Sequence, residues 1–388
     1  MNVRPIVLAV VIVGCTVLGW IIGKQTLLRV DESNLNLETG SNNDSVNKGD
    51  TSQRMITVNK DKAIFTTRNR KLITKAQPTM QATTQNIQQT MRNVVPTMGK
   101  KSLKVYSRDL NNWNLDNNVC KTNTKFQRAW LKTTIGNTPI YIHNPNDDIW
   151  ISKNLLMNGH WEADFVSLVF NLLLKDNAHD IQFVDLGANI GVFTLAVAKL
   201  GVKVIAVEPL SINLQRLCKS VEEGISEDGA PFADRVTIIH NALSDVRENV
   251  QLGKDQQNVG GTYVLKDSNE RKVQGSVVNG KYNDVVMTAK LDDLLQLPNF
   301  DFKKVILKID VEGYESKVFN GGQAFFNTVD VQAVLMEWRW HKGAKDIQSL
   351  LDFFTSRKYK PFNPKQTNPT PLQISDTQKW PGDVLWKK

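Results

Sequence analysis

The sequence predicts an α/β fold of the doubly wound kind, in which helices cover both faces of a mostly parallel sheet. From residue 181 onward, short apolar runs alternate with stretches of helical periodicity. The runs are continuously apolar, which is typical of parallel strands buried on both faces. A glycine-rich turn joins the first run directly to the first helical stretch.

Periodicity also places the individual elements. Short apolar runs bounded by turn residues predict strands, and apolar residues at spacings of three and four predict helices. Residues 246–288 are polar and rich in Gly and Asn, so we expect an insertion there with its own hairpin. The expected strands are 181–186, 203–208, 236–240, 304–310 and 331–337, and the expected helices are 191–200, 211–223, 313–322 and 345–357.

The N-terminal region predicts a membrane anchor. Residues 5–23 carry no charge and lie between Arg4 and Lys24. A helix of that length spans about 28 Å, close to the hydrocarbon thickness of a bilayer. We expect a transmembrane signal anchor after a cytosolic tail of residues 1–4, with the remaining chain in the lumen of the Golgi or another secretory compartment. A cleaved signal peptide is the alternative, although its apolar core is normally shorter.

Residues 24–100 predict a disordered polar stem. They are rich in Ser, Thr, Asn and Gln and contain a single aromatic residue, Phe65. Such a segment buries too little apolar surface to offset its ordering entropy. The folded part is expected to begin near residue 101, with residues 101–180 as an N-terminal extension of a main domain that covers 181–388.

Charge and cysteine content narrow the possible partners. The net charge is +9, but the stem alone holds twelve Lys or Arg and six Asp or Glu, so the folded part is nearly neutral. It shows no Lys/Arg cluster with interleaved aromatic residues, and we expect no nucleic-acid partner. The cysteines Cys15, Cys120 and Cys218 have no zinc-site spacing. We expect Cys120 and Cys218 to be buried thiols, with a disulfide as the open alternative.

The glycine-rich turn predicts an adenosine-containing cofactor. It reads D-x-G-x-N-x-G from Asp185, and Glu208 ends the second expected strand, where a carboxylate can accept both hydroxyls of a ribose. A dinucleotide site requires G-x-G-x-x-G, and the third glycine is missing here. S-adenosylmethionine has no phosphate, and its charged amino-acid end suits Asp185 and the backbone of Gly187. We therefore expect S-adenosylmethionine, with NAD as the alternative.

The segment L-K-I-D-V-E-G-Y-E at 307–315 is the second landmark. Asp310 and Glu312 follow the end of one expected strand, and two carboxylates there are costly unless solvated, paired or used. Lys308 and Asp310 share a strand face because they are two residues apart. A plain Lys–Asp pair, with Glu312 as an acid at a helix start, is the alternative without a catalytic role.

Together, VDLGANIGVFTLAVA, the following AVEP and KIDVEGYE resemble the FkbM family of methyltransferases over about residues 155–340. The resemblance implies a class I, Rossmann-like methyltransferase fold with S-adenosylmethionine as cofactor. It also implies that residues 241–244 face the adenine. The residues that it places at the cofactor are Asp185, Gly187, Asn189, Gly191, Glu208, Asn241 and Ala242.

The resemblance leaves the methyl acceptor open. We expect O-methylation of a hydroxyl on a glycan, a small molecule or another secretory substrate, with Asp310 or Glu312 as the base and His341 in reserve. No metal is expected, because the two carboxylates lack a third ligand at a readable spacing. The alternatives are N- or carboxyl-methylation, or a membrane-tethered binding protein of the same fold without catalysis.

Overall fold

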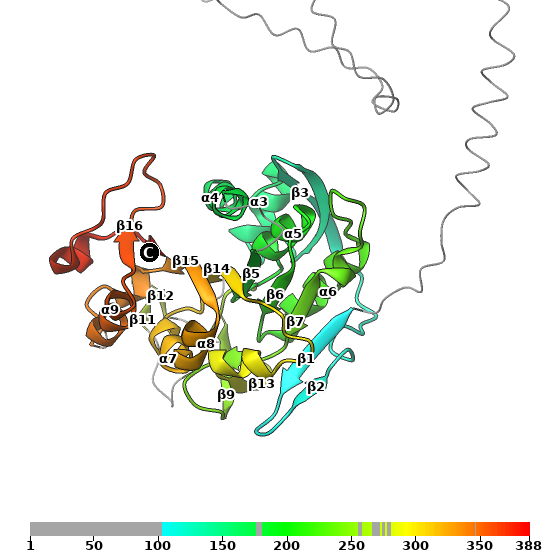
Figure 1. Ribbon diagram of the computed structural model, residues 1–388. Helices are drawn as coiled ribbons and strands as arrows, with labels where there is room; N and C mark the ends of the chain where they lie inside the picture. The colour runs from blue at the N-terminus through cyan, green and yellow to red at the C-terminus, as the bar shows by residue number, and fades with distance from the viewer. Residues whose placement is uncertain are drawn as a thin grey trace, which may run out of the picture. The chain divides into compact units, whose positions relative to one another are not determined.

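A nine-stranded sheet runs through the centre of the computed structural model (Figure 1). Its strands are β1 (Lys104–Arg108), β2 (Trp113–Leu115), β5 (Gln182–Leu186), β6 (Val204–Val207), β7 (Val236–Ile239), β14 (Lys304–Ile309), β15 (Asp330–Glu337), β16 (Lys360–Phe362) and β17 (Asp383–Lys387). The order is β16-β17-β15-β14-β5-β6-β7-β1-β2. All neighbours from β15 to β1 are parallel. The chain builds outward from β5 through β6 and β7 and then returns to β14, so the topological switch point lies between β5 and β14.

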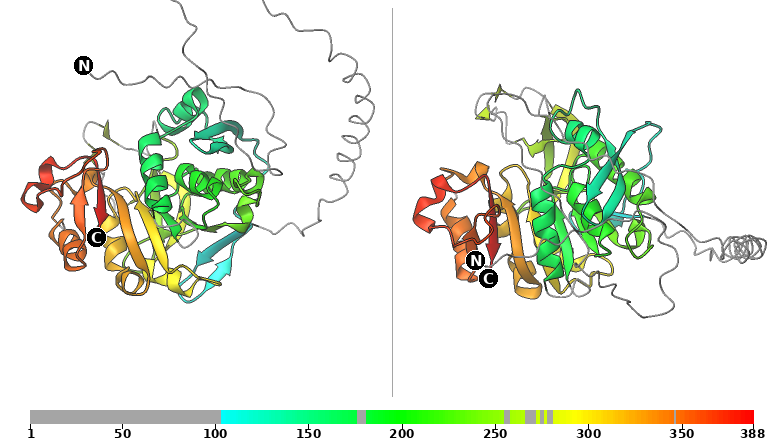
Figure 2. Two further views of the ribbon diagram at one scale, coloured as in Figure 1. Left: turned by 45° about the horizontal axis from the view of Figure 1, so that its top comes forward. Right: turned by 90° about the horizontal axis from the view of Figure 1, so that it is seen from above.

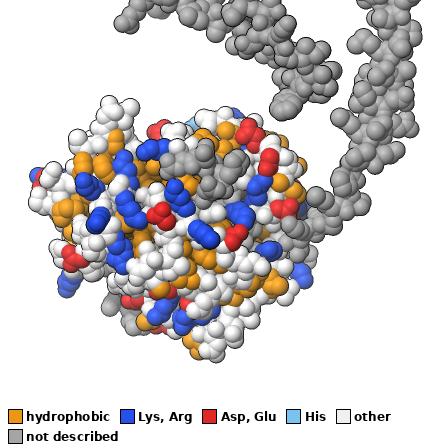
Figure 3. All heavy atoms as spheres, viewed as in Figure 1, with side chains coloured by type: hydrophobic (Ala, Val, Ile, Leu, Met, Phe, Trp, Pro, Cys, Tyr) orange, Lys and Arg blue, Asp and Glu red, His pale blue; other side chains and the backbone are white. Residues whose placement is uncertain are grey.

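The structure describes most of the chain beyond residue 102, and these residues belong to one compact unit, Arg92–Lys388. The face shown in Figure 3 carries Lys and Arg interspersed with Asp and Glu. The described residues are 103–175, 181–254, 258–265, 272–273, 276–277, 281–345 and 347–388.

Helices cover both faces of the sheet (Figures 1 and 2). Successive strand residues point to opposite faces, and Phe183 and Val184 of β5 accordingly pack in two different cores. The core around Phe183 includes residues of α3 (Ile151–Asn158), α4 (Ala163–Leu174), α5 (Val192–Lys199) and α6 (Ser211–Glu223). The core around Val184 includes residues of α7 (Glu315–Asn320), α8 (Gln323–Thr328) and α9 (Ile347–Ser356).

The doubly wound α/β architecture with a mostly parallel sheet is confirmed. All five expected strands and all four expected helices are present, with ends within two residues of the expected ones. The sequence did not predict β1, β2, α8, β16 or β17. These elements are short, and each packs against a strand or helix that lies far from it in the chain.

Residues 103–175 fold together with the main sheet. β1 pairs in parallel with β7, and β2 forms the outer edge. A separate antiparallel hairpin, β3 (Gln127–Thr133) and β4 (Gly136–Ile142), lies over α6. The backbone N–H of Tyr141 in β4 donates to Ser220 Oγ of α6 at 3.0 Å. The hairpin thereby brings the residues that follow β4 close to the end of β6.

The polar segment 246–288 forms an insertion with its own hairpin, as expected. β9 (Asn249–Lys254) pairs antiparallel with β10 (Thr262–Val264) and with β13 (Lys281–Ala289). With β8 (Ala242–Leu243) they make a four-stranded sheet, and β11 (Lys272–Val273) pairs with β12 (Ser276–Val277). The connection between β9 and β10 carries Gly260, which contacts the site described below.

The predicted membrane anchor requires a correction. Residues 5–23, like the predicted tail 1–4 and stem 24–100, lie outside the described residues. Within the described part of the chain, no helix has the length and apolar character needed to cross a membrane. The expected localisation, a single-pass protein with a lumenal domain in the Golgi or another secretory compartment, is therefore not supported.

The prediction of two buried thiols is also wrong. Cys120 and Cys218 form a disulfide, with their Cα atoms 5.7 Å apart. Cys218 lies on the buried face of α6, and Cys120 is in the segment between β2 and β3. The two residues are 98 positions apart in the chain, so only the packing of this segment on α6 reveals the pairing.

Candidate active site

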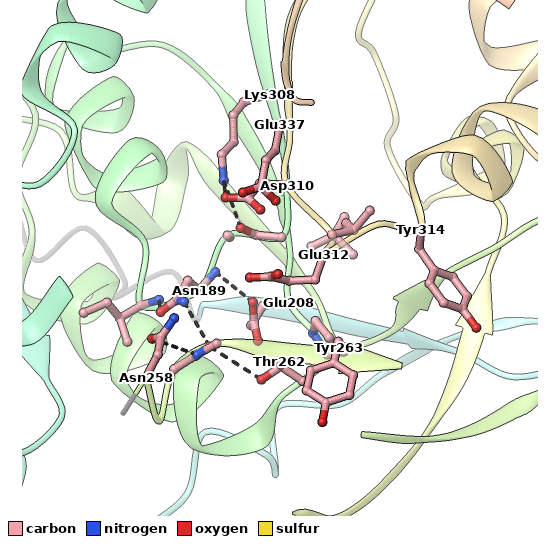
Figure 4. A pocket seen from close by; sticks show the side chains of 18 of the residues that line it. Asn189, Glu208, Asn258, Thr262, Tyr263, Lys308, Asp310, Glu312, Tyr314 and Glu337 are labelled. Carbon is pink, nitrogen blue, oxygen red and sulfur yellow. Dashed lines mark hydrogen bonds and ion pairs between the residues drawn. The ribbon is translucent and has the colours of Figure 1, made fainter. Parts of the chain in front are cut away.

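A cavity of about 510 Å³ opens at the carboxyl ends of β5, β6 and β14. This is the switch point, where open α/β sheets bind their ligands. The backbone N–H of Asp310, just after β14, donates to Leu186 O at the end of β5 at 3.0 Å. Figure 4 shows Lys308, Asp310 and Glu337 gathered at one end of the cavity, and Asn189 and Glu208 toward the other.

The glycine turn lies directly against Asp310. Gly187 has a φ of +81°, and a Cβ placed there would lie 1.9 Å from Asp310 O. Only glycine therefore allows the turn after β5 to approach the end of β14 this closely. Gly191, with a φ of +95°, begins α5. Residues 187–190 of the turn line the cavity, whereas Gly191, which the sequence also placed at the cofactor, does not.

Asn189 ties the turn to two neighbouring segments. Its backbone N–H donates to Glu208 Oε2 at 2.7 Å, and its Nδ2 donates to Gly260 O at 3.0 Å. Its own Oδ1 accepts from the backbone N–H of Ile190 at 2.7 Å. These contacts hold a left-handed backbone at Asn189, with a φ of 53°.

Glu208 follows β6 and is 3% exposed. Its Oε1 accepts from the backbone N–H of Leu210 at 3.0 Å and from Asn213 Nδ2 at 3.1 Å. Burial raises the pKa of Glu208 to about 7, although these donors favour the charged form. The carboxylate lines the cavity, and its acceptor sites suit the vicinal hydroxyls of a ribose.

Asp185 and Lys308 form a buried pair beneath the turn. They are register partners on β5 and β14, and Lys308 Nζ lies 4.0 Å from Asp185 Oδ1 and 3.2 Å from Gly187 O. Asp185 Oδ2 accepts from Thr194 Oγ1 at 2.6 Å. Burial opposes the charge on Lys308, yet Asp310 and Asp185 raise its pKa above the ordinary range. Asp185 thus supports the turn from below, and it is not among the residues that line the cavity.

Three carboxyl groups meet at the other end of the cavity. Oxygens of Asp310, Glu312 and Glu337 lie within 4.8 Å of one another. Asp310 Oδ2 is 3.5 Å from Lys308 Nζ, and Glu337 pairs with Arg339. Burial, together with the charges of Asp310 and Glu312, raises the pKa of Glu337 to about 11. Because three such close carboxyls cannot all be charged, Glu337 keeps its proton at neutral pH.

Glu337 removes the sequence argument against a metal. That argument was the lack of a third ligand near Asp310 and Glu312, and Glu337 is such a third oxygen donor. Lys308 and Arg339 already pair with two members of the group. The structure therefore gives no reason to route chemistry through a metal here.

The residues before β5 supply one wall of the cavity. Trp150, Trp161 and Glu162 line it together with Trp340 from the opposite side. Trp340 Nε1 donates to Glu337 Oε2 at 2.6 Å, which places its indole beside the three carboxyls. Burial raises the pKa of Glu162 to about 7. The cavity thus has aromatic walls around an acidic end.

Three of the sequence-predicted residues, Asp185, Gly191 and His341, do not line the cavity. His341 is buried and does not line the cavity. Its Nε2 lies 2.9 Å from Glu315 Oε2, so a role as reserve base is not supported. Asn241 and Ala242 do line the cavity. The Asn241 side chain bonds to the backbone of Arg108, accepting from its N–H at 2.8 Å and donating to its carbonyl at 3.0 Å.

Sequence reasoning missed Glu337, Arg339, Trp340 and Glu162. Glu337 ends the predicted strand 331–337, and a carboxylate at the end of a strand next to β14 was a usable signal. Glu162 belongs to a segment with no strand or glycine signature, and only its packing over the sheet brings it to the site. Glu315 was quoted in the motif, and the structure shows that it accepts from the backbone N–H of Val311 at 3.1 Å.

The model of the methyltransferase FkbM domain matches residues 185–361. The match begins at the aspartate of the glycine turn and includes Glu208, Asp310 and Glu337. Among curated proteins, none matches the sequence significantly.

Solved methyltransferases match parts of this chain at low identity. A precorrin-6y C5,15-methyltransferase from Geobacter metallireducens is 13% identical over 62% of this chain and 92% of its own, with a TM-score of 0.29. A tRNA (uracil-54, C5)-methyltransferase from Pyrococcus abyssi, in complex with S-adenosylhomocysteine, is 13% identical over 69% and 44%, with a TM-score of 0.30. An O-methyltransferase from Thermotoga maritima is 11% identical over 76% and 96%, with a TM-score of 0.29. Likeness at this level says nothing about the reaction or substrate.

The domain that residues 185–361 match is a methyltransferase domain, and S-adenosylmethionine is the cofactor expected for it. The residues of the cavity fit this cofactor. The backbone of the turn at Gly187 lines the cavity, and Glu208 offers a buried carboxylate for hydroxyl groups. The only Lys and Arg side chains of the described lining are Lys308 and Arg339, and both are engaged by carboxyls, so a pyrophosphate lacks a cationic partner.

Proposed function

We propose that this protein transfers a methyl group from S-adenosylmethionine to a hydroxyl group of an uncharged glycan or a similar polyol. The observation that carries the proposal is the group of three carboxyls that line the cavity, Asp310, Glu312 and Glu337, whose oxygens lie within 4.8 Å of one another. A hydroxyl acceptor gains from a nearby proton acceptor, which the carboxyls provide.

The chain's own residues would hold the cofactor at three points. Glu208 accepts hydrogen bonds from the ribose hydroxyls, the backbone at Gly187 faces the amino-acid end, and Ala242 lies beside the adenine. When bound, S-adenosylmethionine supplies an electrophilic methyl group. The protein's remaining task is to align the acceptor oxygen, and such alignment provides a large part of the rate in reactions of this kind.

Asp310 or Glu312 would take the proton of the acceptor hydroxyl. As the acceptor oxygen took the methyl group, the sulfur–methyl bond would break to leave S-adenosylhomocysteine, the hydroxyl proton would pass to the carboxylate, and the carboxylic acid would later release that proton to water. Glu337 holds its own proton and hydrogen-bonds to Trp340, so it serves as a neutral neighbour that limits the repulsion between the other two. This division of roles follows from their different burial.

Charge and aromatic walls narrow the acceptor class. The described lining has five carboxyls against two cations, which disfavours acidic acceptors such as phosphorylated or carboxylated groups, and nucleic acid with them. Trp150, Trp161 and Trp340 offer flat apolar faces, and the carboxyls offer acceptors for hydroxyl donors. Neutral sugars match both features, because they have apolar faces and hydroxyl donors. An amine acceptor also suits an acidic lining. The experiment must therefore distinguish N-methylation from O-methylation.

The test is methyl transfer from labelled cofactor to three matched acceptor pools. The full chain is incubated with neutral oligosaccharides, acidic oligosaccharides and amino sugars. We expect alkali-stable label in the neutral pool, as an O-methyl ether, and much less in the acidic pool. Label that requires the free amine would show N-methylation. Binding of S-adenosylmethionine without transfer to any pool would contradict the proposed acceptor class.

Affinity for S-adenosylmethionine is expected to depend on Glu208 and on pH. The Glu208→Gln variant should bind about 10–100-fold more weakly at pH 8, because charge-assisted hydrogen bonds to the ribose are lost. In the unmodified protein, affinity should rise as pH increases through about 7, where burial places the pKa of Glu208, because only the ionised form accepts at both oxygens. Calorimetry at pH 6, 7 and 8 measures both effects.

The matched control is Glu222→Gln on the exposed side of α6, which should leave affinity and its pH dependence unchanged. Equal affinity of the Glu208 variant and the unmodified protein at pH 8 would contradict the ribose assignment.

A further inference from the structure

A chain of buried side chains connects the residues before α3 to Glu208. His143 follows β4, and its Nε2 lies 2.7 Å from Asn213 Oδ1. Asn213, in the first turn of α6, donates from Nδ2 to Glu208 Oε1 at 3.1 Å. The exposed fractions of His143, Asn213 and Glu208 are 2%, 0% and 3%. The path therefore runs through the protein interior, where an unmade hydrogen bond is costly.

The orientation of the Asn213 amide follows from its partners. Its Nδ2 also donates to Gly260 O at 2.9 Å, and both Gly260 O and the Glu208 carboxylate are acceptors. Asn213 Oδ1 must then face His143, and His143 must donate from Nε2. Burial and the nearby Arg216 lower the pKa of His143 to about 4, although Asp148 and Asp147 oppose this. The imidazole is thus neutral at physiological pH and has one N–H to give.

His143 is itself held in place. Its backbone N–H donates to Ser152 Oγ at 3.0 Å, and Ser152 Oγ donates to Asp148 Oδ2 at 2.5 Å. Asp148 Oδ1 accepts from the backbone N–H of Ile151 at 3.1 Å, which joins this network to the start of α3. The backbone of His143 is therefore tied to the start of α3, and its imidazole contacts Asn213 of α6.

We propose that His143 is a positioning residue of the cofactor site, which fixes the Asn213 amide so that its N–H points at Glu208. The inference rests on the proposed role of Glu208 toward the ribose. Without an N–H from His143, Asn213 Oδ1 loses its buried donor, and only Gly260 O and Glu208 still favour the present orientation of the amide. A rotated amide would point Oδ1 at the carboxylate and repel it. Glu208 would then lose a donor and the orientation in which it meets the ribose.

Two variants of His143 separate this role from simple packing. In His143→Gln, the side-chain Nε2 can occupy nearly the position of the imidazole Nε2 and still donate to Asn213. In His143→Leu, the volume is similar but no donor remains. A packing role predicts that the two variants behave alike, whereas the positioning role predicts that only the leucine variant changes Glu208.

The first readout needs no ligand. In the full chain with ¹³C-labelled glutamate, the Glu208 carboxyl signal is assigned by its absence in Glu208→Gln. A lost donor disfavours the charged form, so His143→Leu should move the titration midpoint of Glu208 upward by about 0.4–1 pH unit. His143→Gln should leave it in place. Lys308, the cation that acts on Glu208, is unchanged in all variants.

The second readout is affinity for S-adenosylmethionine. His143→Leu should weaken binding about 3–10-fold at pH 8, and His143→Gln should stay within about twofold of the unmodified protein. If the midpoint moves as expected but no variant binds the cofactor, the proposed function fails and the positioning role stands. An unmoved midpoint in a folded His143→Leu variant overturns the inference.

A measurement on the unmodified protein guards against a variant that does not fold. The ¹⁵N shifts of the imidazole distinguish the two neutral tautomers. We expect His143 to be neutral from pH 6 to 8 and protonated at Nε2 alone. A proton on Nδ1 with a bare Nε2 would overturn the inference, because the imidazole could then not donate to Asn213.

Discussion

Replacing Asp310 by asparagine is expected to reduce methyl transfer by about 10²–10⁴-fold, the usual contribution of a positioned base. The substitution keeps the shape of the side chain but removes its capacity to take a proton. Asp310 has a half-buried side chain that lines the cavity, and its backbone closes the contact with Leu186 and Gly187. Affinity for S-adenosylmethionine should remain within a few-fold, because that backbone contact does not depend on the carboxylate.

Glu312→Gln and Glu337→Gln complete the experiment. Glu312 shares the proton-accepting role in our proposal, so at least one of the Asp310 and Glu312 variants should lose most turnover. Glu337 keeps its proton at neutral pH, and its glutamine variant should retain more activity than the weaker of the other two. Asp301→Asn, on an exposed carboxylate paired with Lys203, is the matched control.

The comparison is made in a single-turnover assay with the neutral acceptor pool. Normal turnover in both Asp310→Asn and Glu312→Gln would show that neither carboxyl is the base. In that case Glu162, whose pKa burial raises to about 7, would be the next group to test.

Loss of the Cys120–Cys218 disulfide is expected to cost about 4–5 kcal/mol of unfolding free energy. The estimate follows from loop closure in the unfolded chain, since the bond joins residues 98 positions apart. The bond also ties the segment after β2 to the buried face of α6, the helix that carries Asn213 near its start. Its loss should therefore lower the stability of the fold more than it changes methyl transfer at the three carboxyls.

Urea unfolding of the full chain measures this effect with and without a reductant. The Cys120→Ala/Cys218→Ala variant should unfold at a lower urea concentration, and the reductant should not lower it further. The reduced unmodified protein should approach the same midpoint. If reductant leaves the unmodified midpoint unchanged, the bond does not contribute in the way proposed.

Much of the fold and half of the site were accessible from local sequence. The strands β5, β6, β7, β14 and β15 are short apolar runs, and the turn after β5 requires glycine because a Cβ at Gly187 would overlap Asp310 O. Glu208, Asp310 and Glu312 were found because each follows a predicted strand. In a parallel sheet, strand ends meet at one edge, so position along the chain is enough to place them together.

The tertiary structure decided what depends on contacts between distant segments. Glu337 joins Asp310 and Glu312 because β15 lies beside β14, and burial there raises the pKa of Glu337. His341 is not a candidate base, because its side chain is buried and its Nε2 contacts Glu315.

By itself, the sequence determined the doubly wound sheet, the glycine turn and the carboxylates that end its strands, since these follow from periodicity and from residues adjacent in the chain. Only the tertiary structure decided the disulfide, the aromatic walls and the link from His143 to Glu208. Cys120 meets Cys218, and His143 meets Asn213, across 98 and 70 positions of sequence. The physical reason is that these pairs form through the packing of the N-terminal hairpin on α6, and no local pattern encodes that packing.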